Sequence, residues 1–104
     1  MSLYTIIFLF RGGTYISQFY ADNEASALRK WAGNPDDEML AGIGFADKKS
    51  SWIATARSRL EDEDSQLVPL TGLRSAWYTH ILIGRSGGHI NVIETMDGGV
   101  SASD

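Results

Sequence analysis

An alternation of apolar and more polar residues runs through both ends of the chain. Near the N-terminus, large apolar residues occupy every second position from 4 to 10. A period of two predicts β-strands with one buried face. A glycine pair, Gly12-Gly13, interrupts the pattern and can adopt the positive φ angles of a tight turn. We therefore expect a β-hairpin with this pair as its turn and Phe10 opposite Tyr15.

The two faces of this hairpin differ in composition. One face is dominated by large apolar side chains: Tyr4, Ile6, Phe8, Phe10, Tyr15 and Phe19. The other mixes aliphatic and polar side chains: Thr5, Ile7, Leu9, Ile16, Gln18 and Tyr20. The first composition predicts a core face. The second is still too apolar to be left in water without a partner.

A second alternating stretch, with strands over 77–84 and 89–96, predicts another hairpin. Its turn is expected within 85–88, which contains the glycine pair Gly87-Gly88. Its predominantly apolar face holds Trp77, Thr79, Ile81, Ile83, Ile90, Val92, Glu94 and Met96. Its mixed face holds Tyr78, His80, Leu82, His89, Asn91, Ile93 and Thr95.

The two histidines of the chain are the obvious candidates for metal ligands. In the predicted register His89 lies opposite Gly84 or a near neighbour. It is then about four residues along the strand from His80, a separation on the order of 13 Å. Two ligands of one zinc ion must lie much closer. We therefore expect no metal site within one chain.

The middle of the chain carries helical patterns. Asp22 or Asn23 can cap a helix over about 23–32. Asn34-Pro35 starts a second, short helix that the glycines at 42 and 44 end. A third helix is expected over 47–60, although 51–55 could instead form a strand. Residues 67–73 predict a connector or a short edge strand.

These elements predict an α+β fold: two β-hairpins flank two or three helices. The hairpins form a four-stranded, mainly antiparallel sheet with the helices on one face. A single domain is expected over 1–97, followed by a flexible tail over 98–104.

The mixed face of the predicted sheet faces away from the helices. Its apolar residues predict that a binding partner covers it. The expected partner is a second copy of the chain, or another protein. The interface residues would be Ile7, Leu9, Ile16, Leu82 and Ile93. The alternative is a small-molecule-binding protein or minor enzyme that uses Tyr20, Tyr78 and His80. The residues of that ligand site would be Gln18, Tyr20, Tyr78, His80 and Asn91.

Composition narrows the function classes further. The chain has no cysteine, which excludes disulfides and thiol chemistry and fits a cytoplasmic location. Its net charge of −4 argues against nucleic acid as a partner. No apolar run approaches the length of a membrane span. No serine lies in a Gly-x-Ser-x-Gly elbow, and Gly42-Ile43-Gly44 lacks the third glycine of a dinucleotide loop. We therefore expect neither catalytic residues nor a cofactor.

Two segments carry a resemblance to known sequences. Residues 10–18 (FRGGTYISQ), followed by 25–31, resemble the opening of a family of small bacterial proteins of unknown function. Residues 68–73 (VPLTGL), followed by Trp77, are similar to a late segment of the same family. The resemblance implies turns and core aromatics, and no activity. The hairpin followed by an Ala-rich helix is also loosely similar to the antitoxin partner of HicA-type toxins. The chain lacks the extra strand and the glycine-rich stretch expected in that family, so this similarity implies no function.

Overall fold

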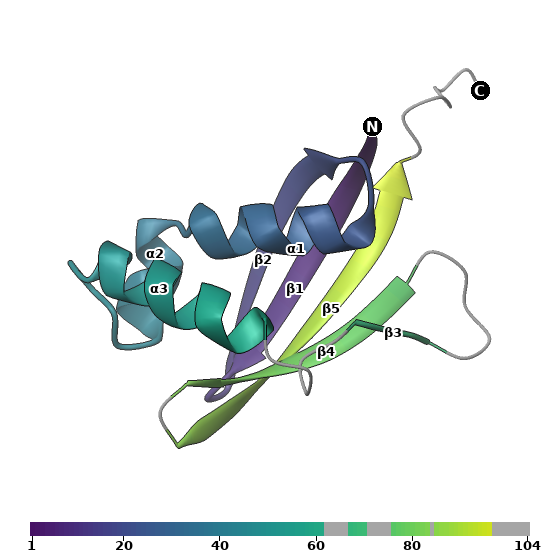
Figure 1. Cartoon of the computed structure of the whole chain (residues 1–104). Helices are drawn as coiled ribbons and strands as arrows, with labels where there is room; N and C mark the ends of the chain where they lie inside the picture. Colours follow the sequence, from purple (N-terminus) through teal and green to yellow (C-terminus); the bar gives the residue numbers. More distant parts are fainter. Residues whose placement is uncertain (62–66, 71–75, 84, 97–104) are drawn as a thin grey trace.

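Five strands form one antiparallel sheet, and three helices cover one of its faces (Figure 1). The computed structural model describes residues 1–61, 67–70, 76–83 and 85–96. In chain order the elements are β1 (Ser2–Phe10), β2 (Gly13–Ala21), α1 (Glu24–Gly33), α2 (Asp37–Gly42), α3 (Lys49–Leu60), β3 (Val68–Pro69), β4 (Ala76–Ile83) and β5 (Ser86–Met96). The strand order is β2-β1-β5-β4-β3. The predicted α+β class is confirmed, with β3 as a fifth, two-residue edge strand. The tail expected over 98–104 lies outside the described residues.

The first hairpin turns one position earlier than its glycine pair predicts. Phe10 pairs with Gly13, so the turn residues are Arg11 and Gly12, with φ angles of 50° and 81°. Positive φ at both positions is the geometry of a type I′ turn. A left-handed arginine costs about 1–2 kcal/mol. Two contacts offset that cost: Arg11 Nε donates to Ser86 Oγ at 3.1 Å, and the guanidinium lies 5.4 Å from the centre of the Phe10 ring.

The register of the first hairpin is therefore two residues away from the predicted one, with Phe8 opposite Tyr15. A shift of two residues leaves every side chain on its original face. The predicted core face is accordingly confirmed, since Tyr4, Ile6, Phe8 and Phe10 are all buried.

The predicted turn of the second hairpin is wrong. Ile83 pairs with Ser86, so only residues 84 and 85 join the strands, and Gly87 and Gly88 belong to β5. Gly88 lies against the core: a Cβ there would be 2.6 Å from Phe8 Cε1 and 3.3 Å from Ile81 Cγ2. Glycine is required at position 88 because any larger side chain would clash with these core residues. The corrected register places His80 directly opposite His89, so the predicted separation of the histidines is wrong.

The core lies between the sheet and the helices. Phe8 on β1 contacts Trp31 of α1 with ring centroids 5.1 Å apart. Trp31 and Trp52 of α3 meet edge to face at 5.5 Å. Edge-to-face geometry is the favourable arrangement of aromatic rings. These three rings therefore tie both longer helices to the central strands.

Two of the three described helices, α1 and α2, begin at a side chain that accepts from one of their first N–H groups, whereas α3 has no side-chain cap. Asn23 Oδ1 accepts from the Ser26 N–H, and Asp36 Oδ1 accepts from the Met39 N–H, both at 2.8 Å. Asp36, and not the predicted Asn34, thus caps α2. Residues 51–55 lie inside α3, so the alternative of a strand there is wrong. None of the helices in the described part of the chain has the length and apolar character needed to cross a membrane.

Gly42, the last residue of α2, leaves room for the Tyr15 side chain. A Cβ on Gly42 would clash with Tyr15 Oη and would lie 2.9 Å from Tyr15 Cζ. We expect Gly42→Ala to destabilise the protein by about 1–2 kcal/mol, because overpacking outweighs the better helix propensity of alanine. Urea unfolding followed by far-ultraviolet circular dichroism measures the loss. Tyr15→Phe is the matched background: it removes the clashing oxygen, so an undiminished cost there would contradict the steric explanation.

Candidate functional site

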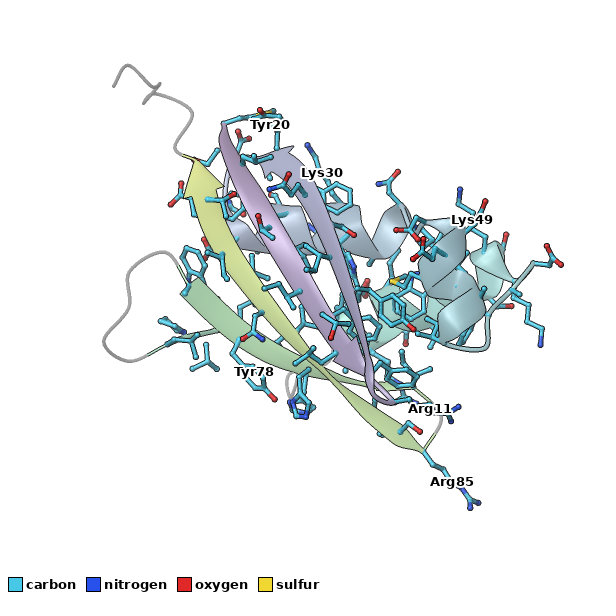
Figure 2. All side chains as sticks on the ribbon, turned by 180° about the vertical axis from the view of Figure 1, so that it is seen from behind. Arg11, Tyr20, Lys30, Lys49, Tyr78 and Arg85 are labelled. Atoms are coloured by element: carbon cyan, nitrogen blue, oxygen red, sulfur yellow. The ribbon has the colours of Figure 1, made fainter. Side chains whose placement is uncertain are left out.

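The candidate site is the face of the sheet that carries no helix, which we call the open face. Figure 2 views the molecule from the side opposite to the helices. Strand alternation and pairing place the following described residues on the open face: Leu3, Thr5, Ile7, Leu9, Thr14, Ile16, Gln18, Tyr20, Val68, Ala76, Tyr78, His80, Leu82, Gly87, His89, Asn91, Ile93 and Thr95.

Exposed apolar side chains concentrate on the open face. Six large hydrophobic residues are exposed among those described, and all except Met1 lie on this face. The exposed fractions of the five residues on the open face range from 38% for Leu9 to 63% for Ile16, with Tyr20, Val68 and Leu82 between these values. Scattered exposed apolar residues are normal on a soluble protein. Their gathering on one face is typical of an interaction surface.

The open face also lacks formal charge. Aspartate, glutamate, lysine and arginine make up 21% of the chain, yet none of them is among its described residues. The described charges lie on the helices, turns and connections, except for Glu94, which lies on β5 opposite Tyr4 of the core face. A surface without ionised groups can be covered without the large cost of desolvating a charge.

Polar side chains at one end of the open face bond to one another. Gln18 Nε2 donates to Thr5 Oγ1 at 3.0 Å, and Thr5 Oγ1 donates to Thr95 Oγ1 at 3.1 Å. Thr95 Oγ1 in turn donates to the carbonyl oxygen of Leu3 at 3.0 Å. This chain of bonds crosses β2, β1 and β5. Because these groups already have partners, covering them costs less than burying free hydroxyls and amides.

A second polar group on the open face consists of Tyr78, His80 and His89. The Tyr78 hydroxyl lies 2.6 Å from His89 Nδ1, and the two rings are 5.8 Å apart. His80 pairs with His89 across the strands, and both imidazoles are exposed. No cluster of three or more metal-ligating His, Cys, Asp or Glu residues occurs among the described residues.

The structure divides the predicted ligand residues into two groups. Tyr78, His80 and Asn91 lie on the adjacent strands β4 and β5. Gln18 and Tyr20 lie on the edge strand β2, three strand spacings from β4, or about 14 Å across the sheet. A single small-molecule site that includes Tyr20 together with Tyr78 would therefore have to span most of the sheet.

The predicted interface residues all share the open face. Leu9, Ile16 and Leu82 are exposed there, and Ile7 and Ile93 are half-buried. His89 lies on the predicted face, but its pairing with His80 was not predicted. Val68 was not assigned to the face, because its strand is too short to show alternation.

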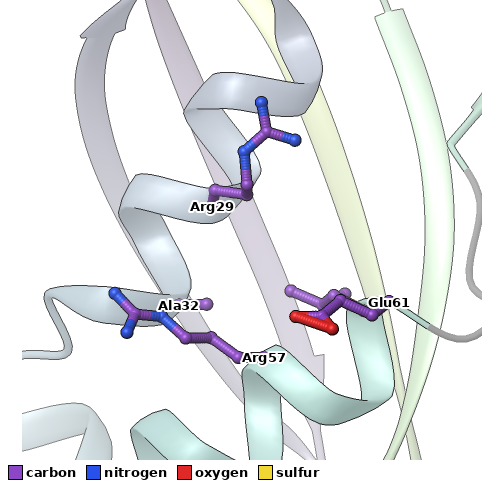
Figure 3. A pocket seen from close by; sticks show the side chains of 5 residues that line it. Arg29, Ala32, Arg57 and Glu61 are labelled. Carbon is purple, nitrogen blue, oxygen red and sulfur yellow. The ribbon is translucent and has the colours of Figure 1, made fainter.

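A pocket lies away from the open face, between α1 and α3 (Figure 3). Its volume is about 460 Å³, and Arg29, Ala32, Arg57, Leu60 and Glu61 line it. Figure 3 shows the two arginine side chains extending in different directions. Arg57 lies over Gly33, where an added Cβ would be 2.8 Å from its Nη2 atom. The guanidinium groups are thus not arranged as a clamp for one anion.

The chemistry of the open face allows two kinds of event. Its uncharged apolar area can be covered by another surface, and its paired imidazoles can bind a proton or a cation.

Comparison of the chain with known proteins finds no matching family model, no matching curated protein and no matching solved structure.

Proposed function

We propose that this protein is an interaction module that forms a homodimer through the open face of its sheet. One observation carries the proposal: five of the six exposed large apolar residues among those described gather on this uncharged face. A patch of this kind is typical of a protein–protein contact.

The absence of charge favours a second copy of the chain as the partner. A two-fold interface sets a patch against itself, so any charged group near the axis would meet its own like charge. The described residues of the open face include no aspartate, glutamate, lysine or arginine, so they avoid this repulsion. A partner selected by electrostatic complementarity would instead require charges on this face.

The size of the open face also suits a dimer. The four longer strands, at about 4.8 Å each, span about 19 Å, and a nine-residue strand extends about 30 Å. The resulting area of about 570 Å² is of the same order as the roughly 800 Å² that each partner contributes to a standard interface.

Sedimentation equilibrium of the full chain tests the proposal. We expect a mass of twice the 11.4 kDa of one chain at tens of micromolar, with dissociation on dilution. A monomer throughout that concentration range would contradict it.

A further inference from the structure

We propose that His80 and His89 form a surface site for a divalent first-row transition ion such as copper(II), nickel(II) or zinc(II), with Tyr78 as a positioning residue. The two ligands belong to one chain. The site therefore goes beyond the proposed dimer, and it can form in the monomer, where the open face is uncovered.

The pairing of β4 with β5 brings the imidazoles within reach of one ion. His80 and His89 are direct cross-strand partners on the open face, which places their Cβ atoms about 4.5–5.5 Å apart. Metal–nitrogen bonds of about 2.0–2.1 Å require neighbouring ligand nitrogens to lie about 3 Å apart. Two exposed imidazoles, each with two rotatable bonds, can meet this spacing without any movement of the strands.

Tyr78 supplies the outer contact that metal-binding histidines usually have. Its hydroxyl lies 2.6 Å from His89 Nδ1. When His89 is the ligand, Nδ1–H donates to the Tyr78 oxygen, and the lone pair of Nε2 is left for the metal. Such a bond fixes both the tautomer and the orientation of the ring.

The donor set indicates which ions bind. Imidazole suits copper(II), nickel(II) and zinc(II), whereas oxygen-preferring ions find no carboxylate among the described residues of this face. Two protein nitrogens leave the other coordination positions to water, so the affinity is below that of a closed four-ligand site. Affinity should follow the order copper(II) above nickel(II) and zinc(II), with manganese(II) last.

Isothermal titration of the full chain with copper(II), zinc(II) and manganese(II) chlorides tests the site. We expect one copper ion per chain, with affinity lowered about 10-fold or more by His80→Asn or His89→Asn. Tyr78→Phe, which keeps the ring and removes the hydroxyl, should weaken binding by about 10-fold. Electron paramagnetic resonance of the copper complex should report two nitrogen ligands in the unmodified protein and one in each histidine variant.

Ile16→Lys is the matched control, since it lies on β2, two strands from His89, and disturbs only the proposed dimer contact. Copper binding retained in this variant supports a site within one chain, and binding lost there overturns it. Equal affinity of the unmodified protein and His80→Asn, an exposed position that folding does not need, also overturns the site. Unchanged affinity in Tyr78→Phe contradicts the positioning role.

Discussion

Replacing Trp52 with alanine is expected to lower the free energy of unfolding by about 3–5 kcal/mol. Trp52 is fully buried, and its ring lies 5.5 Å from Trp31 and 5.7 Å from Phe45. It is the main contact of α3 with the aromatic core. Domains of this size have total stabilities of about 5–15 kcal/mol. The substitution should therefore remove a large part of the stability.

Trp52→Phe is the matched variant for this prediction. The Trp52 indole N–H is buried without a hydrogen-bond partner, so phenylalanine loses no bond and keeps most of the aromatic contacts. We expect it to cost less than half of the alanine effect. Urea unfolding by far-ultraviolet circular dichroism, which does not rely on tryptophan emission, measures both. A loss below about 1 kcal/mol for alanine, an ordinary surface value, would contradict the packing of α3 described above.

The faces of the sheet could be predicted from the sequence because they depend only on the parity of positions. Phe8 and Tyr15 lie on the core face in the predicted register and in the observed one, since the two differ by an even number of residues. The same reasoning placed Leu9, Ile16 and Leu82 together on the open face. The apolar surface was thus accessible to sequence analysis.

The register could not be predicted, because neither glycine pair is the turn. In the first hairpin a left-handed Arg11 takes a turn position that glycine or asparagine usually occupies. Gly13 starts β2 instead, where a Cβ would be 2.6 Å from Tyr15 Oη. Gly88 also lies within a strand, β5, where a Cβ would be 2.6 Å from Phe8 Cε1. Close packing and turn formation both favour glycine, and the residue pattern alone does not separate them.

The two parts of the candidate site differ in predictability for this reason. An interface needs only the right face, whereas a two-histidine site needs a particular cross-strand partner. A register error of an even number of residues leaves the predicted face intact but separates His80 from His89. The single pairing of these histidines therefore became visible only with the backbone in place.

If the proposed dimer forms through the open face, replacing Leu82 with lysine is expected to convert it to a monomer without unfolding the chain. Leu82 is exposed on the open face, so the fold loses little when its side chain changes. In the dimer a lysine there would be desolvated among apolar groups, a cost of several kcal/mol. A loss of about 2.8 kcal/mol already raises the dissociation constant 100-fold. We therefore expect at least that increase, measured by sedimentation equilibrium.

Ala54→Lys is the control, because it adds the same charge at an exposed position of α3. Each substitution changes the net charge from −4 to −3, which weakens the repulsion between two copies. Dissociation in Leu82→Lys alone would thus arise from the covered face and not from net charge. If Leu82→Lys and Ala54→Lys both keep the dimeric mass, the two chains associate through another surface, since a lysine cannot be buried in an apolar contact between two open faces without a large loss of affinity.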